Sequence, residues 1–453
     1  MRTVGVEIVG AIGRRSGRRV IYARGVSVDS RSVEAGQVFF ALTGARVDGH
    51  TFVREVLERG AAAAVVSRPL DLPEPLLDRV VLVPDVLRAL GESAREHRRR
   101  WNGLVLGVTG SNGKTTTREM IHHILSDQIS CKRSPKSYNT NVGVPLTLFE
   151  AEPADRALIV EMGTNAPGEI AELAAIAEPN AGLITCIAET HLEGLGSLEG
   201  VARAKGELLQ ALGMAGTAFL NADDNWLDSL RNRHTGRTIC FGMGERAGFR
   251  GENLTTDEAG SCFTARGRAF RLNVPGRHNV MNSLAALSVA EHLGLDLERA
   301  ATRLETFRLP DMRYQMEMVR GIHVVFDGYN ANPGSVRSAL RTFGETPVRG
   351  RRAAVLGDML ELGPQSESLH GQIGREAARC GLNALWAVGA FSAPLADAAR
   401  DGGLAGDVRH GSDVDTVAEE VLAYLRPGDA LLVKGSRGMK LERLVEKLRG
   451  FAG

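Results

Sequence analysis

The sequence lacks the features that mark several classes of protein. Its five cysteines are scattered and none stands in a C-x-x-C pair, so the sequence indicates neither a disulfide framework nor a zinc knuckle. No apolar run approaches the length of a membrane span, and the first residues contain no signal-peptide core. The formal net charge of +1 gives no general electrostatic reason to bind nucleic acid or an anionic membrane. We therefore expect a cytoplasmic protein without nucleic-acid binding or membrane insertion.

Length and composition predict a multidomain globular protein. Apolar residues make up 43% of the 453 positions and charged residues 24%, which is typical of soluble proteins. At about 150 residues per domain, we expect three domains, over residues 1–100, 101–310 and 311–453. Short apolar runs alternate with helical patterns, which predicts an α/β fold with parallel sheets covered by helices. No G-x-G-x-x-G motif follows a strand, so dinucleotide binding is not supported.

The predicted elements follow from apolar runs and helical periodicity. We predict strands at residues 37–42, 62–67, 80–83, 104–108, 157–161, 182–187, 323–326, 353–356, 384–388 and 430–433. We predict helices at residues 51–59, 86–99, 115–125, 169–177, 198–212, 279–292, 335–343, 367–380, 414–425 and 439–448. Residues 238–275 carry the alternation expected of hairpins.

The most informative stretch is a glycine-containing turn between a strand and a helix. The turn and helix start read Gly110, Ser111, Asn112, Gly113, Lys114, Thr115 and Thr116. Glycines let the backbone approach a phosphate, and free N–H groups at a helix start point at it. The lysine adds a positive charge, and a threonine hydroxyl could hold Mg²⁺. The pattern is shorter than the common P-loop, because position 108 is Val, but it favours ATP binding over an ordinary turn with a surface lysine.

Polar side chains follow two further predicted strands. Glu161 ends the strand at 157–161, and His191 follows the strand at 182–187. In open parallel sheets, ligands bind beyond the carboxyl ends of the strands. A carboxylate at that edge suits Mg²⁺, although a strand-end Glu can also cap a helix. His191 could contact metal or phosphate or could be structural, and Lys205, on a predicted helix, would by spacing alone be solvated.

Two more clusters concentrate polar residues. Asn279 and Asn282 lie one turn apart at a helix start, where the first could be an N-cap but the second, a poor helix former, lacks that explanation. Asp327, Tyr329, Asn330 and Asn332 lie in the run that follows the strand at 323–326. Asn and Pro could form a plain turn there. The density of polar groups favours a binding site.

These motifs together resemble the Mur ligases, the amide ligases of bacterial cell-wall synthesis, across nearly the whole chain. The runs that carry the resemblance are residues 110–116, 139–148, 191–194, 278–282, 329–333, 357–363 and 433–437, with 29–31, 39–42 and 48–50 near the start. The resemblance implies a UDP-substrate domain, a central ATP-binding domain and a C-terminal Rossmann-like domain. The runs at 329–333, 357–363 and 433–437 resemble the branch that joins D-alanyl-D-alanine to UDP-N-acetylmuramoyl-tripeptide.

The resemblance also implies roles for individual residues. Glu161 and His191 would contact Mg²⁺ with Thr115, and Lys205 would be the lysine that relatives convert to a carbamate with CO₂. The ATP molecule would be held by residues 110–116 with Asn279, Asn282, Arg313 and Asp327. Ser30 and Arg31 would face the UDP group. Tyr329, Asn330 and Asn332 would lie on the dipeptide side.

The expected enzyme is an ATP-dependent amide ligase that acts through an acyl phosphate and works as a monomer. The nearest alternatives are the sister ligase that adds the third amino acid and a folylpolyglutamate synthase. The sister ligase carries an Asn-Pro-Arg type motif that this sequence does not contain. An alternative of another class is a P-loop regulatory ATPase.

Overall fold

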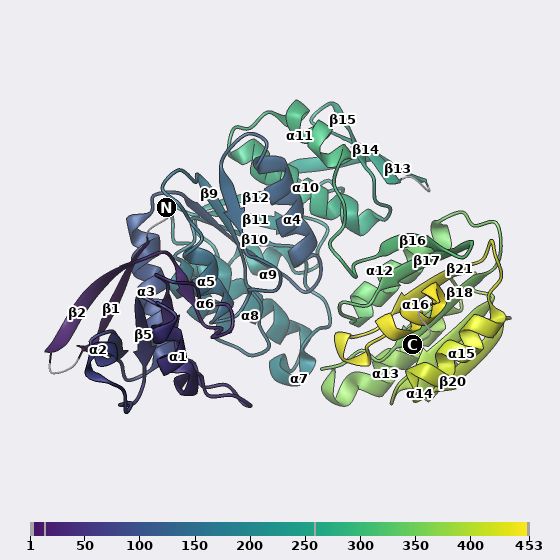
Figure 1. Cartoon of the computed structure of the whole chain (residues 1–453). Helices are drawn as coiled ribbons and strands as arrows, with labels where there is room; N and C mark the ends of the chain where they lie inside the picture. The colour runs from purple at the N-terminus through teal and green to yellow at the C-terminus, as the bar shows by residue number, and fades with distance from the viewer. Residues whose placement is uncertain (1–3, 13–14, 258–259, 451–453) are drawn as a thin grey trace.

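The chain folds around three β-sheets that follow one another along the sequence. The computed structural model describes residues 4–12, 15–257 and 260–450. Figure 1 shows the N-terminal domain in purple and the C-terminal domain in green to yellow, on opposite sides of the central domain. The predicted α/β class with three domains is confirmed. No helix of the described residues is long and apolar enough to cross a membrane.

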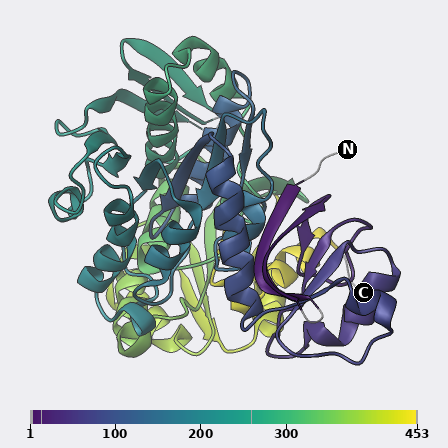
Figure 2. The ribbon, with the colours of Figure 1, turned by 90° about the vertical axis from the view of Figure 1, so that its left-hand side faces the viewer.

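The N-terminal sheet has the strand order β2-β1-β6-β5-β4-β3. Its elements are β1 Val4–Ile12, β2 Arg15–Ala23, β3 Val26–Ser27, β4 Val38–Phe40, η1 Gly49–Phe52, α1 Val53–Glu58, β5 Ala63–Val66, α2 Glu74–Leu77, β6 Val80–Leu82 and α3 Val86–Arg100. Strands β3 to β6 are parallel. The strands β4, β5 and β6 lie within the predicted ranges, whereas β3 was not predicted. The antiparallel ribbon of β1 and β2 was not predicted. Figure 2 shows this ribbon in dark purple at the border of the central domain.

The central sheet has nine strands in the order β15-β14-β13-β12-β11-β10-β7-β9-β8. Its first elements are β7 Leu104–Thr109, α4 Lys114–Leu125, β8 Cys131–Arg133, α5 Gly143–Leu148, β9 Ala157–Glu161, α6 Glu169–Ala177, β10 Ala181–Ile184, α7 Leu192–Leu195 and α8 Leu198–Ala211. The remainder are β11 Thr217–Asn221, α9 Leu227–Arg231, β12 Arg237–Gly242, β13 Phe249–Asp257, β14 Gly260–Ala265, β15 Arg268–Leu272, α10 Arg277–His292 and α11 Leu297–Glu305. Strands β7, β9 and β10 are parallel neighbours, so their carboxyl ends share one edge.

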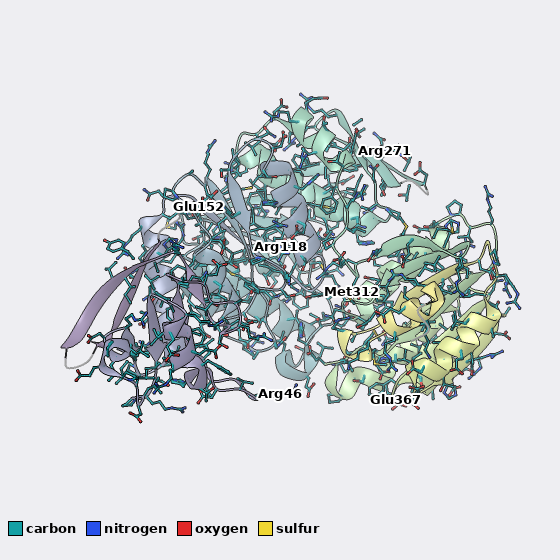
Figure 3. All side chains as sticks on the ribbon, in the orientation of Figure 1. Arg46, Arg118, Glu152, Arg271, Met312 and Glu367 are labelled. Atoms are coloured by element: carbon teal, nitrogen blue, oxygen red, sulfur yellow. The ribbon has the colours of Figure 1, made fainter. Side chains whose placement is uncertain are left out.

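The C-terminal sheet has the order β16-β17-β21-β18-β19-β20, with only β16 antiparallel. Its elements are β16 Gln315–Val319, β17 Ile322–Asp327, α12 Pro333–Glu345, β18 Arg352–Gly357, η2 Gly363–Gln365, α13 Ser366–Ala377, β19 Ala384–Val388, α14 Ser392–Asp401, β20 Asp407–Gly411, α15 Val414–Tyr424, β21 Ala430–Lys434, η3 Arg437–Met439 and α16 Glu442–Arg449. In the connection from the central domain, Met312 and Tyr314 have φ of 60° and 49°. Figure 3 shows Met312 where the two domains meet.

The N-terminal and central domains share one apolar core. Helix α3 begins at its N-cap Asp85, whose side chain accepts a hydrogen bond from the Arg88 amide. Its apolar face, which includes Leu90, packs in the same cluster as Phe40 of the N-terminal sheet and Leu158 of the central sheet. Burial of such side chains contributes roughly 1.5–3 kcal/mol each. The first two domains are therefore joined by packing as well as by the chain.

Candidate active site

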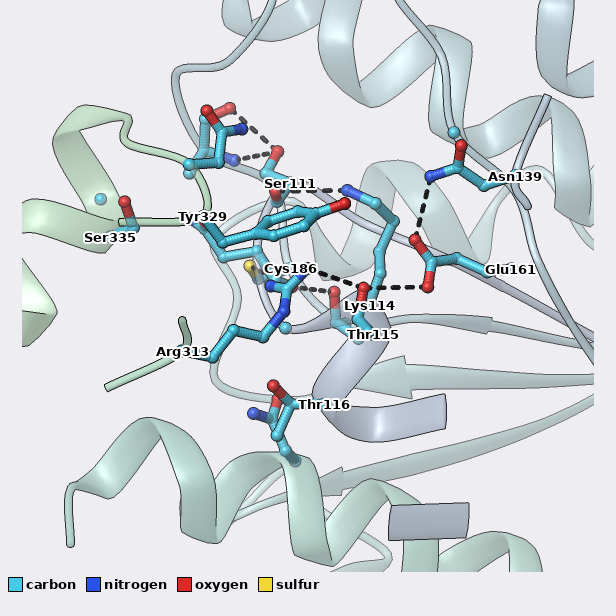
Figure 4. A pocket seen from close by; sticks show the side chains of 18 of the residues that line it. Ser111, Lys114, Thr115, Thr116, Asn139, Glu161, Cys186, Arg313, Tyr329 and Ser335 are labelled. Carbon is cyan, nitrogen blue, oxygen red and sulfur yellow. Dashed lines mark hydrogen bonds between the residues drawn. The ribbon is translucent and has the colours of Figure 1, made fainter. Parts of the chain in front are cut away.

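A cavity of about 680 Å³ lies between the central and C-terminal domains (Figure 4). The central domain contributes the turn after β7, the ends of β9 and β10, and the start of α10. The C-terminal domain contributes residues from the connection before β16, the loop after β17 and the first turns of α12. The cavity therefore lies at the carboxyl ends of parallel strands, where such sheets bind ligands.

The predicted phosphate loop has a backbone that requires glycine. Gly110 and Gly113 have φ of 145° and 81°, in the region that L side chains rarely adopt. A Cβ on Gly110 would lie 1.8 Å from Thr185 Oγ1, and one on Gly113 would lie 2.5 Å from Asn282 Oδ1. Helix α4 begins at Lys114 directly after the loop. The loop can therefore present backbone amides and a helix N-terminus to a phosphate.

Lys114 is held beside this loop. Its Nζ donates to the Gly110 carbonyl oxygen at 2.7 Å and lies 3.5 Å from that of Ser111. Burial lowers the pKa of Lys114; Glu161 opposes this effect and Arg313 adds to it. The cavity thus places two cations, Lys114 and Arg313, where a phosphate chain would need them.

Glu161 ends β9 as predicted and is 2% exposed. Its Oε2 accepts from Thr115 Oγ1 at 3.0 Å and from Arg118 Nη1 at 2.9 Å. Its Oε1 accepts from Asn139 Nδ2 at 3.0 Å. The Thr115 hydroxyl and the Glu161 carboxylate are both hard oxygen donors, which is the donor chemistry that Mg²⁺ prefers. Their adjacency fits a magnesium ion bound beside a phosphate.

His191 lines the cavity, whereas Lys205 lies deeper in the protein. His191 has φ of 52°, and its Nδ1 lies 2.5 Å from Glu361 Oε2 of the C-terminal domain. Lys205 is 1% exposed, so it is not the solvated lysine that spacing alone predicts. Burial, with the charge of Lys114, holds the pKa of Lys205 well below its ordinary value. No group of three His, Cys, Asp or Glu side chains suited to a metal occurs in residues 4–12, 15–257 and 260–450.

The two predicted asparagines at the start of α10 also line the cavity. Asn279 Nδ2 donates to the Pro275 carbonyl oxygen at 2.8 Å, and Asn282 Oδ1 accepts from Thr117 Oγ1 at 3.1 Å. Next to them, burial lowers the pKa of His278 to about 4. Both asparagines are buried, and Asn282 lies beside Gly113.

The C-terminal domain brings Arg313 and Tyr329 over the loop. The Arg313 guanidinium lies 4.1 Å from the centre of the Tyr329 ring, and its Nη2 donates to Thr115 Oγ1 at 2.8 Å. The Tyr329 hydroxyl lies 2.6 Å from Ser137 Oγ of the central domain. These contacts connect the two domains directly over the strand ends.

Asp327 ends β17 and is held by the buried Lys434. Lys434 Nζ donates to Asp327 Oδ2 at 2.6 Å and to the Asn330 carbonyl oxygen at 3.0 Å. The Tyr314 amide donates to Asp327 Oδ1 at 3.2 Å. Asp327 and Asn330 line the cavity. The predicted cluster after β17 is therefore assembled around one lysine.

Besides Gly110 and the deeper Lys205, three predicted residues do not line this cavity. Ser30 and Arg31 lie in the N-terminal domain, where Arg31 pairs with Asp29 at 2.7 Å. Asn332 is buried as the N-cap of α12 and bonds to Asn112. Their predicted roles in substrate binding stay predictions.

Sequence reasoning assigned no site role to four residues that the structure places here. These are Arg118, Asn139, Lys434 and Glu361. Arg118 lies one turn after Lys114 on α4, so helical spacing could have indicated it. Glu361 reaches His191 from 170 residues away, which no local pattern reveals.

Comparisons with known proteins agree over most of the chain. The Mur ligase family, catalytic domain model matches residues 23–98, the Mur ligase middle domain matches 108–290, and the Mur ligase, glutamate ligase domain matches 312–437. UDP-N-acetylmuramoyl-tripeptide–D-alanyl-D-alanine ligase of Bacillus subtilis is 34% identical, over 94% of this chain and 93% of the relative. The enzyme of the same name from Escherichia coli is 33% identical, again over 94% and 93%.

Solved structures give the same result. MurF from Acinetobacter baumannii superposes with a TM-score of 0.86 at 29% identity, over 96% of this chain and 95% of that one. MurF ligase from Thermotoga maritima in complex with ADP superposes with a TM-score of 0.82 at 27% identity, over 94% and 97%.

Proposed function

Because the chain belongs to the Mur ligase family, we propose that it joins D-alanyl-D-alanine to UDP-N-acetylmuramoyl-tripeptide with hydrolysis of ATP to ADP and phosphate. The observation that carries the proposal is the shared cavity. It brings the phosphate loop, the Glu161 strand end and the loop after β17 together. A ligase needs this arrangement, since nucleotide, acid and amine must meet.

The chemistry overcomes the low reactivity of a carboxylate. A carboxylate oxygen of the tripeptide attacks the γ-phosphorus of ATP, the bond to the bridging oxygen breaks, and ADP leaves. The dipeptide amine then attacks the acyl carbon, loses a proton, and phosphate departs from the tetrahedral intermediate. Lys114 and Arg313 would offset the negative charge that moves during phosphoryl transfer. Contact between the domains would exclude water from the acyl phosphate.

Thr115 and Glu161 would hold Mg²⁺, with His191 nearby. The ion would supply charge neutralisation at the transferring phosphoryl group. Lys205 would act as a carbamate: burial favours its neutral amine, and the neutral amine is the form that adds CO₂. The carbamate formed on Lys205 would supply an anionic oxygen donor for the metal ion.

The other residues would bind the substrates. Residues 110–116, with Asn279, Asn282 and Asp327, would hold ATP. Ser30 and Arg31 would hold the UDP group, and Tyr329 and Asn330 would face the dipeptide. Asn332, also predicted on the dipeptide side, bonds to Asn112 instead. The proposal includes a monomeric cytoplasmic enzyme, and light scattering after size-exclusion chromatography tests the monomer.

The test is phosphate release and product mass with UDP-N-acetylmuramoyl-tripeptide, with and without D-alanyl-D-alanine. We expect amide product and phosphate in equal amounts, only when both substrates are present. Formation of an amide between free diaminopimelate or lysine and the UDP-linked precursor that carries only two amino acids would instead identify the sister ligase. Phosphate release that needs neither substrate would identify a regulatory ATPase.

A further inference from the structure

Two asparagine side chains from different domains form a reciprocal pair at the phosphate loop. Asn112 Nδ2 donates to Asn332 Oδ1 at 3.1 Å, and Asn332 Nδ2 donates to Asn112 Oδ1 at 2.7 Å. Asn112 belongs to the loop, and Asn332 precedes α12 of the C-terminal domain. The pair thus connects the loop to the first turn of that helix.

The helix cap fixes the orientation of this pair. Asn332 Oδ1 accepts from the Ser335 amide at 2.9 Å, and Ser335 Oγ accepts from the Asn332 amide at 3.0 Å. Within the Asn332 amide only the oxygen can accept a hydrogen bond, so its NH₂ group must point the other way. It points at Asn112. Asn332 is 3% exposed, so water does not readily replace a lost partner.

The loop side of the pair is equally fixed. The carbonyl oxygen of Asn112 accepts from Thr185 Oγ1 at 2.5 Å, at the end of β10. A Cβ on Gly334 would lie 3.2 Å from Asn112 Nδ2, so the start of α12 approaches the loop closely. Movement of α12 away from the loop must break both amide hydrogen bonds.

We propose that Asn112 and Asn332 are positioning residues that hold the C-terminal domain in register with the phosphate loop, so that the amine and not water reaches the acyl phosphate. This inference rests on the proposed ligase activity. When the register is lost, a water oxygen attacks the acyl phosphate, phosphate leaves, and the tripeptide carboxylate is regenerated. The net reaction is then hydrolysis of ATP to ADP and phosphate without an amide.

The principal variant is Asn332→Asp in the full-length enzyme. Asp is as good an N-cap as Asn, so α12 keeps its cap. The carboxylate has no donor for Asn112 Oδ1 and places oxygen against oxygen. We expect about a tenfold fall in the kcat of amide formation, and more than one phosphate released per amide formed. Asn112→Ala removes the other half of the pair, and the double variant should be no worse than the poorer single variant.

The matched control is Asp413→Asn. Asp413 is the N-cap of α15 in the same domain, where its side chain accepts from the Thr416 amide. This control replaces a carboxylate oxygen by an NH₂ group at a helix start, which is the reverse of the change in Asn332→Asp. The site lies away from the cavity. We expect one phosphate per amide and wild-type kcat.

The ratio of phosphate to amide separates positioning from stability. A variant that is merely less stable loses both products equally, because fewer molecules are active. A ratio of one in both Asn332→Asp and Asn112→Ala would overturn the inference, whatever the loss of kcat. A wild-type enzyme that forms no amide would instead overturn the proposed function, and the inference with it.

Discussion

Glu161→Gln should separate the electrostatic role of this side chain from its shape. Gln has nearly the same volume but no charge, so the buried Arg118 loses its partner at 2.9 Å. Both side chains are 2% exposed. The same carboxylate is the proposed magnesium donor with Thr115, so stability and metal dependence should change together.

The size of the effect follows from the geometry. At 2.9 Å and an effective dielectric constant of about 20, the attraction is roughly 6 kcal/mol before desolvation. Removal of one partner of a buried pair typically costs about 3–5 kcal/mol. Arg118 also has Glu119 at 2.7 Å, so we expect the lower end, about 3 kcal/mol. For a domain of this size, that corresponds to a fall in Tm of roughly 6–12 °C.

The assay is thermal unfolding of the wild type, Glu161→Gln, Arg118→Met and the double variant. Because the double variant leaves no unpaired charge, it should be more stable than the sum of the single effects implies. Activity of Glu161→Gln should require far more Mg²⁺ or be lost. An unchanged Tm, or strictly additive effects, would refute the reasoning.

Three further predictions concern the cavity. Lys114→Met should lower turnover about 10²–10³-fold, which steady-state kinetics checks. It should not lower the Tm of the nucleotide-free enzyme in calorimetry, because burial lowers the pKa of Lys114 and its charge is unfavourable in the fold. Gly113→Ala should weaken ATP binding in calorimetry through its clash with Asn282, whereas Gly168→Ala, at a similar φ with nothing within 4 Å, should not. The pKa of His278 is about 4 in the fold against 6.5 ordinarily, so the unfolded chain takes up the proton first and stability falls from pH 6.5 toward 4; His278→Gln should flatten the dependence of Tm on pH.

The sequence predicted β7, β9 and the loop between β7 and α4 well because their signals are local, whereas β8 and β11 were not predicted. The run at 157–161 is apolar and ends in a carboxylate, and β9 has these same bounds. The helix at 169–177 was likewise correct. The motifs at 110–116 and 329–333 also carried the family resemblance, which the family models confirm.

Features that depend on distant partners were not predicted. The ribbon of β1 and β2 was missed. The helices α11 and α14 were also missed, although α11 has a local N-cap in Asp296. Lys205 follows a helical pattern that does not say which face is covered, and the fold buries it. Asn112 and Asn332 are 220 residues apart, so their contact depends on how two domains dock.

The connection that carries Arg313 is built from residues that would relax elsewhere. Met312 and Tyr314 both hold a left-handed backbone without being glycine, a conformation that costs of order 1–3 kcal/mol per residue. The contacts that this segment makes over the loop must outweigh that cost. That cost falls on either side of Arg313, the residue that contacts both Tyr329 and Thr115.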